Sequence, residues 1–245
     1  MSNLNLKSVI EKVKSRGYWR LVIEPIDNIP SPFEHSRDAE PILNDALIKL
    51  RGWYYPHIPQ QNNDHQRINI EDNRLDGYII MDHFLEAWSY FISGQFVHLL
   101  GLREDWFKES GWFEEGHYLK KVEPRTKLDF VGVTLTLTEM FLFANNLINK
   151  VNYGGSFRII ITLNNGENRT LTTFDPRRIP MFFNYESSAV TMTAFNAIVT
   201  VEELNKSTLE LAEKAAVRIF KYFKDFNPPV QVIKDDQIKL IERRL

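Results

Sequence analysis

Residues 85–102 (LEAWSYFISGQFVHLLGL) decide the fold, because they fit either two strands or one helix. At period two, one face carries Trp88, Tyr90, Ile92, Phe96, Leu100 and Leu102, whereas a helical face would carry Leu85, Trp88, Ile92, Phe96 and Leu99. Aromatic and β-branched residues flank the pair Ser93-Gly94, and this composition favours strands that bend at the glycine. We therefore predict sheet in the middle of the chain.

The flanking segments alternate between helical and extended patterns. Helices are predicted over residues 6–16, 37–50, 103–113 and 201–225 and after Thr136, and strands over 18–26, 51–57, 67–71, 77–84, 157–163, 169–174 and 189–199. Ser36 is expected to cap the second helix, and the sequence Asn164-Asn165-Gly166-Glu167 predicts a hairpin between its neighbouring strands. Capping boxes at Thr136/Glu139 and Thr200/Glu203 predict the starts of two long helices, and residues 152–155 are expected to end the first of them.

This order predicts an α+β fold with antiparallel sheets and packed helices. A chain of 245 residues can form one large domain or two intimately packed halves, which would be residues 1–117 and 118–245. Lys and Arg number 12 against 18 Asp and Glu in the first half, and 18 against 14 in the second, so the halves carry −6 and +4. This asymmetry is too small to predict a nucleic-acid surface.

The composition also limits the chemistry and the compartment. The chain has no cysteine, which excludes disulfides, thiolate zinc sites and cysteine nucleophiles. The sequence shows no signal peptide and no uninterrupted apolar span, so we expect a cytoplasmic protein that does not bind a membrane.

All five tryptophans and all six histidines lie within the first 117 residues, which is where we look first for a site. The segment Arg51-Gly52-Trp53-Tyr54-Tyr55-Pro56-His57 combines arginine with aromatic rings, as recognition surfaces do, although an edge strand filling the core would show the same pattern. The predicted binding residues are Arg51, Trp53, Tyr54, His57, Gln95, His98, Arg103, Arg177 and Arg178.

No motif for catalysis or for a cofactor is present. The chain has neither a phosphate-binding loop nor a GxGxxG sequence, and its histidines lack chelating spacing, so we predict no metal, no cofactor and no catalytic residue. One alternative stays open, a metal-dependent nuclease or hydrolase with a non-standard site around Asp82, Glu86 and His98.

Two blocks, residues 51–57 and Ser93-Gly94-Gln95-Phe96-Val97-His98, together with Arg103-Glu104-Asp105 and residues 137–144, resemble blocks in uncharacterised bacterial proteins. Some of those proteins carry a Schlafen/AlbA-type DNA-binding domain, to which nothing in this chain corresponds. The resemblance implies a bacterial protein of a regulatory or antiviral defence system, and implies no activity.

The function expected from these observations is a non-catalytic protein-interaction module or a sensor or scaffold. Its partner would be another protein, a second copy of the chain, or both. Besides the hydrolase, a second alternative is weak nucleic-acid binding through Arg51, Arg103, Arg177 and Arg178.

Overall fold

Seven antiparallel strands form the central sheet, in the order β10-β7-β1-β5-β4-β3-β2. We describe residues 5–26, 31–151 and 155–245 of a computed structural model. The strands are β1 (Tyr18–Pro25), β2 (Gln66–Glu71), β3 (Arg74–Met81), β4 (Phe84–Phe91), β5 (Phe96–Gly101), β7 (Ser156–Asn164) and β10 (Thr191–Thr200). Because β1 pairs with both β5 and β7, the sheet runs without interruption across the boundary at residue 117.

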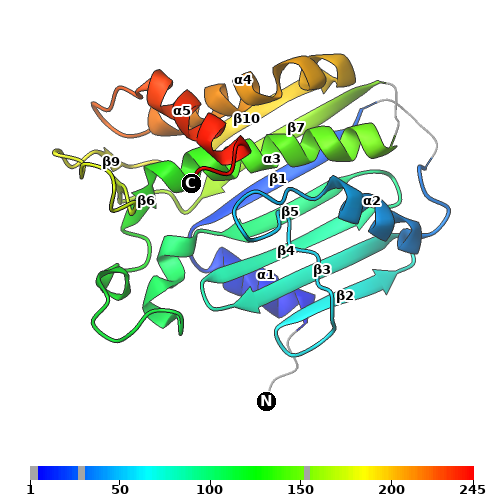
Figure 1. Cartoon of the computed structure of the whole chain (residues 1–245). Coiled ribbons are helices and arrows are strands. Elements are labelled where there is room, and N and C mark those ends of the chain that lie inside the picture. The colour runs from blue at the N-terminus through cyan, green and yellow to red at the C-terminus, as the bar shows by residue number, and fades with distance from the viewer. Residues whose placement is uncertain (1–4, 27–30, 152–154) are drawn as a thin grey trace.

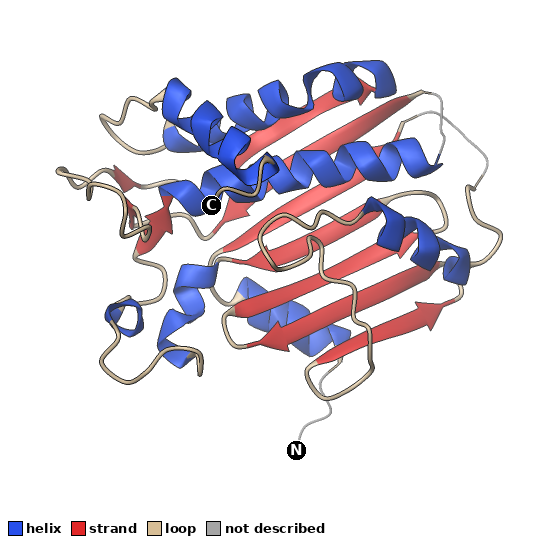
Figure 2. Ribbon diagram, in the orientation of Figure 1, coloured by secondary structure: helices blue, strands red, loops and turns tan. Residues whose placement is uncertain are grey.

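Helices cover both faces of this sheet (Figures 1 and 2). One face carries α2 (Ala39–Ala46), α3 (Phe130–Val151), α4 (Val201–Phe220) and α5 (Val230–Ile241), and the other carries α1 (Leu6–Lys14). Three 3-10 helices, η1 (Ser36–Asp38), η2 (Arg103–Glu109) and η3 (Tyr118–Lys121), and a small sheet of β6 (Lys127–Asp129), β8 (Arg169–Thr172) and β9 (Glu186–Ser187) complete the fold. The predicted α+β class is confirmed.

Residues 85–102 form the two strands β4 and β5, as predicted, and turn at Gly94, whose φ of +83° suits glycine. The alternation of β4 sorts its side chains between two cores. Leu85 and Ala87 pack beneath α1, whereas Trp88 and Tyr90 belong to the main core. Glu86 therefore faces the main-core side, where the candidate site lies.

Gly77 leaves room for an indole ring. It lies opposite Trp88 across β3 and β4, and a Cβ at residue 77 would lie 2.1 Å from Trp88 Cζ2. The indole cannot move freely, because Trp88 Nε1 donates to the carbonyl of His57 (2.8 Å). We expect Gly77→Ala to lower the free energy of unfolding by about 1–3 kcal/mol in urea denaturation. Trp88→Phe should lower the free energy of unfolding less in the Gly77→Ala background than in the wild type. If the losses of the two single variants simply add in the double variant, this account is contradicted.

The helix boundaries confirm one capping prediction and correct two. Thr200 caps α4, accepting the Glu203 N–H at 3.1 Å. By contrast, α3 begins at Phe130, so the Thr136 capping box is wrong. The carboxylate of Asp129 accepts the Gly132 N–H (2.9 Å) and supplies the cap instead. Ser36 is also not an N-cap: it lies inside η1, and its hydroxyl donates to the carbonyl of Glu71.

The hairpin predicted around Asn164–Glu167 is wrong. β7 pairs with β1 and β10, whereas β8 pairs with β6 and β9 in the small sheet. The turn after β7 contacts the end of α1 instead, because the Asn165 amide donates to the carbonyls of Lys14 and Arg16 (3.0 and 2.7 Å). The chain therefore leaves the large sheet there. Of residues 152–155, which were predicted to end the preceding helix, 152–154 lie outside the described residues, and the helix ends at Val151.

α3 is the core helix of the main layer. It is long and apolar enough to cross a membrane, yet 72% of its most apolar window is buried inside the fold. Such burial is typical of the core helix of a soluble protein.

Candidate functional site

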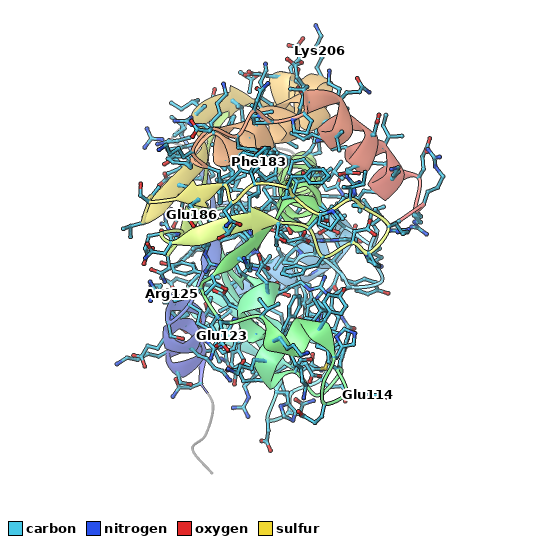
Figure 3. The ribbon with its side chains drawn as sticks, turned by 90° about the vertical axis from the view of Figure 1, so that its left-hand side faces the viewer. Glu114, Glu123, Arg125, Phe183, Glu186 and Lys206 are labelled. Atoms are coloured by element: carbon cyan, nitrogen blue, oxygen red, sulfur yellow. The ribbon has the colours of Figure 1, made fainter. Side chains whose placement is uncertain are left out.

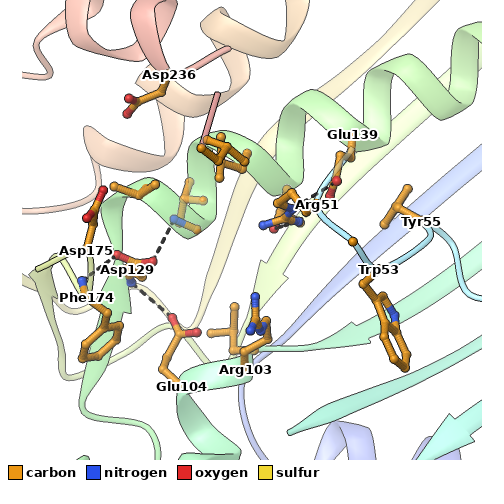
Figure 4. A pocket seen from close by; sticks show the side chains of 18 of the residues that line it. Arg51, Trp53, Tyr55, Arg103, Glu104, Asp129, Glu139, Phe174, Asp175 and Asp236 are labelled. Carbon is orange, nitrogen blue, oxygen red and sulfur yellow. Dashed lines mark hydrogen bonds and ion pairs between the residues drawn. The ribbon is translucent and has the colours of Figure 1, made fainter. Parts of the chain in front are cut away.

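A cavity of about 1010 Å³ opens where the β4–β5 face, η2, the first turns of α3, α5 and the segment after β8 meet (Figure 4). Its apolar wall carries aromatic rings, of which Trp53 and Phe84 stack with centroids 4.3 Å apart. Its polar groups include two arginines, Arg51 and Arg103, and several carboxylates. Cavities of this size and mixed lining are typical of small-molecule sites.

The segment of residues 51–57 approaches the cavity as a loop, and the predicted edge strand is wrong. A single bridge joins Ile48 to Tyr55 through two hydrogen bonds of 2.9 Å, and the Tyr55-Pro56 peptide bond is cis. Trp53 and Tyr55 line the cavity, whereas Tyr54 points away, 44% exposed, beneath the Lys49 ammonium. The expected alternation of side chains holds even without a sheet partner.

Arg51 is neutralised within the protein. Its Nε donates to Glu139 Oε1 at 3.0 Å, its Nη2 donates to Glu139 Oε2, and Nη2 also lies 3.3 Å from the Thr136 hydroxyl. The Glu139 side chain is 1% exposed, so this bidentate pair satisfies a carboxylate buried in α3. Arg51 therefore fixes the loop to α3, and its charge is largely matched.

Arg103, in contrast, forms no ion pair with a carboxylate among the described residues. Its one hydrogen bond to a described residue runs from Nη2 to His83 Nε2 (3.1 Å), and its guanidinium lies 4.6 Å from the centroid of the Phe84 ring. Figure 4 shows this side chain projecting into the cavity toward Arg51. Burial, then the Arg51 charge, lowers the pKa of Arg103 to about 10, so it remains cationic at neutral pH. Although Arg103 is exposed to solvent, its guanidinium forms no ion pair with a carboxylate among the described residues, and its forked N–H donors suit an anionic ligand.

His83 supports Arg103 as an uncharged acceptor. Burial, then the Arg103 charge, lowers the pKa of His83 to about 4. Because a guanidinium only donates, Nε2 accepts a hydrogen bond from Arg103 and Nδ1–H donates one to the Ser110 hydroxyl (3.0 Å). His83 thus orients the arginine without cancelling its charge.

A buried chain of polar groups lies behind the cavity wall. His98 Nε2 donates to Glu86 Oε2 (2.7 Å), and His98 Nδ1 lies 3.1 Å from the Tyr55 hydroxyl. Burial, then Glu86 and Glu139, raises the pKa of Tyr55 well above its usual value, so the phenol keeps its proton. Glu86 Oε2 also accepts the backbone N–H of His57 (3.2 Å), which ties the loop to β4. His98 is therefore a structural histidine.

Two carboxyl groups lie beside Arg103. Glu104 Oε1 accepts the Asp129 N–H (3.1 Å), and Asp129 in turn accepts the N–H groups of Phe174 (3.2 Å) and Gly132 (2.9 Å). Among the described residues Glu104 Oε2 has no hydrogen-bond partner. Burial, then the charges of Asp105 and Asp129, raises the pKa of Glu104 to about 7; burial also raises that of Asp129.

The raised pKa of Glu104 makes stability depend on pH. An unfolded glutamate loses its proton near pH 4.5, whereas folded Glu104 keeps it until about pH 7. The folded state therefore binds more protons in this interval, and the free energy of unfolding falls as the pH rises from 4.5 to 7. We expect Glu104→Gln to remove this loss, so that its stability relative to wild type improves by on the order of 2 kcal/mol between pH 5 and pH 8. Parallel urea-denaturation curves for the two proteins at every pH would contradict the assignment, and Glu123→Gln, at an exposed glutamate, is the control.

Asp105, the residue after Arg103 and Glu104, fixes the position of η2. Asp105 is 1% exposed and forms a bidentate ion pair with the fully buried Arg169 (2.9 and 2.6 Å). Its oxygens also accept the backbone N–H groups of Gly17 (2.7 Å) and Arg125 (2.8 Å). Asp105 thereby joins η2 to the start of β1 and to the small sheet.

The far wall of the cavity carries matched charges. Arg178 contacts Asp236 and lies 3.7 Å from Asp175, which also binds Arg177 (2.9 Å). The Arg177 side chain is 69% exposed, and its carboxylate partner is two residues away. Asp236 Oδ2 is buried without a hydrogen bond from any described residue. These arginines serve first to neutralise neighbouring acids.

The structure thus gathers some of the predicted binding residues and separates others. Arg51, Trp53, Arg103, Arg177 and Arg178 line the cavity. His57 stacks against Trp53 and bonds to Gln66 (2.8 Å), just outside the cavity lining. Gln95 lies on the turn between β4 and β5, where it bonds to Glu24 (3.2 Å). Glu104, Asp129, Glu139 and Trp112 line the cavity but were not among the predicted binding residues. Glu139 was assigned to a capping box, and its charge within an apolar helix was the one signal available for it.

Comparison with protein-family models, with curated proteins and with solved structures finds no match to this chain. The resemblance to bacterial proteins of defence systems stays a prediction. Among the residues described, no three His, Asp or Glu side chains come together as metal ligands would.

Proposed function

We propose that this chain is a binding protein, of the sensor type, for a small ligand that joins an anionic group to a planar apolar group. The observation that carries the proposal is Arg103, a cation lining a large cavity that forms no ion pair with a carboxylate among the described residues. The other cavity arginines, Arg51, Arg177, Arg178 and Arg244, have such partners.

The aromatic wall supports the apolar half of this ligand. Trp112 lines the cavity and is 56% exposed, although its edge contacts His83 and Phe84. A planar ring stacked on the open indole would cover surface that now faces solvent. Phe107 and Phe113 continue the same wall and meet edge to face, with centroids 5.5 Å apart.

Phenyl phosphate is the simplest probe of both halves. We expect it to raise the melting temperature and to bind more tightly than inorganic phosphate or neutral benzyl alcohol in calorimetric titration. Equal effects of all three compounds, or none, would contradict the proposal. The cytoplasmic location and a role in defence stay predictions that this experiment does not address.

Protein interaction is the second candidate, and one surface favours it. Ile179, Phe182 and Phe183, in the segment between β8 and β9, are 75%, 87% and 70% exposed, and Figure 3 shows Phe183 on the surface beside β9. A second copy of the chain is the partner we propose, because the rings would then be covered. Light scattering should give a dimer that Phe182→Ser with Phe183→Ser converts to a monomer; a wild-type monomer would contradict self-association.

The two remaining alternatives have less support. A metal-dependent hydrolase needs converging ligands, but Glu86 and His98 bond to each other and Asp82 accepts the Gly111 N–H (2.7 Å). A nucleic-acid surface needs free cations on an open face, but three of the four arginines named for it pair with carboxylates.

A further inference from the structure

We infer that the ligand of this cavity is a ribonucleotide, with its phosphate on Arg103, a sugar hydroxyl on Glu104 and its base against Trp112. This inference rests on the proposed function and narrows it to one chemical class. It follows from the different bonding capacities of two consecutive residues at the cavity floor.

Arg103 and Glu104 are adjacent and oppositely charged, yet they form no ion pair with each other. Arg103 turns toward Arg51, and Glu104 turns toward Asp129 (Figure 4). The guanidinium has five N–H donors and uses one on His83, so its other donors are available. The floor therefore presents donors and an acceptor side by side.

Glu104 Oε2 is the acceptor in question. Its carboxyl is anchored through Oε1, the residue is 6% exposed and lines the cavity, and Oε2 accepts no hydrogen bond from a described residue. Asp129 and Asp105 differ from Glu104 because both of their oxygens accept hydrogen bonds. A carboxyl oxygen in a cavity wall that has no protein partner can accept a hydrogen bond from a ligand in place of water.

A hydroxyl suits this position better than an ammonium or an amide. A hydroxyl can donate to the Glu104 carboxylate or accept from its protonated form, and the neighbouring cation Arg103 disfavours a second cation at this position. An anion for Arg103, hydroxyls for Glu104 and a planar ring for Trp112 occur together in nucleoside phosphates. The cavity volume of about 1010 Å³ accommodates a molecule of that size.

The test is a calorimetric titration of the full chain with AMP, GMP, CMP, UMP, ribose 5-phosphate and inorganic phosphate. We expect ribose 5-phosphate to bind at least tenfold more tightly than inorganic phosphate, and at least one nucleotide to bind more tightly still. If phenyl phosphate binds but neither ribose 5-phosphate nor any nucleotide exceeds inorganic phosphate, this inference is wrong and the proposed function stands. If no anion binds, both are wrong.

The contact between Glu104 and the sugar hydroxyls is isolated by removing Glu104 from the protein and the hydroxyls from the ligand, separately and together. Glu104→Ala should lower the affinity of the best ribonucleotide, measured relative to that of inorganic phosphate, at least tenfold. The 2′,3′-dideoxy form of that nucleotide should keep the same affinity relative to inorganic phosphate in wild type and in Glu104→Ala. Glu123→Ala, at an exposed glutamate, is the matched control and should change nothing. If Glu104→Ala weakens binding of the ribonucleotide and of its 2′,3′-dideoxy form by the same factor, the assignment of the hydroxyl to Glu104 is wrong.

Discussion

Replacing Arg103 by methionine is expected to weaken anion binding about 10- to 150-fold and, at the same time, to stabilise the unliganded protein. The first effect follows because charge-assisted hydrogen bonds contribute about 1.5–3 kcal/mol. The second follows because burial and the Arg51 charge disfavour the cation, which forms no ion pair with a carboxylate among the described residues. Since the side chain still reaches solvent in the cavity, we expect a gain of only about 1 kcal/mol.

The two effects are measured separately, by titration with phenyl phosphate and by urea denaturation without ligand. Arg103→Lys keeps the charge but loses the planar fork, so its affinity should fall between wild type and Arg103→Met. Arg67→Met, at an exposed arginine of the edge strand β2, should change neither quantity. A purely structural role for Arg103 would instead lower the stability of Arg103→Met, and that result would refute the site.

Arg169→Met is expected to cause the largest loss of stability, about 3–5 kcal/mol in urea denaturation. The substitution leaves Asp105 charged, 1% exposed and without its bidentate partner, and such an orphaned charge is far more costly than a missing surface pair. Arg103 and Glu104 belong to the same η2 turn, so ligand affinity should fall as well.

The matched control is Arg125→Met. Arg125 pairs with Glu167 at the surface, where the side chains are 45% and 20% exposed, so its loss should cost under about 1 kcal/mol. Asp105→Asn combined with Arg169→Met should recover part of the stability lost in Arg169→Met, because no uncompensated charge remains. Equal losses for Arg125→Met and Arg169→Met would show that the buried pair contributes no more than the exposed one.

Much of the fold was predictable because it follows from local periodicity. Period-two patterns located β1, β4, β5 and β10, and the Thr200 cap located α4. The departure of the chain from the large sheet after β7, in place of the predicted hairpin, was not predictable, since the Asn165 amide bonds to the end of α1, about 150 residues earlier. Likewise, α3 begins six residues before the first capping box, because Asp129 provides the cap without a typical local signature.

The site was only half predictable for a related reason. Arg51, Trp53 and Arg103 stood out as cations and rings, and the cavity brings them together. Glu104 and Asp129 looked like ordinary surface acids, and their raised pKa values come from burial by segments that are distant in the sequence. Gly17 is similar: it marked the end of a helix, but a Cβ there would lie 2.2 Å from Arg169 Nη2.

The pair of Asp105 and Arg169 also sets when the cavity can form during synthesis. The turn that carries Arg103 is anchored through Asp105 by Arg169, 64 residues later in the chain. Strand β1 also cannot complete its pairing until β7 is made, since Tyr18 pairs with Asn164. A ribosome-bound chain that has emerged only as far as residue 150 therefore contains Arg103 but not Arg169. Contacts of such long range are typical of slow, cooperative folding, so ligand capture would report that the nascent protein has finished folding.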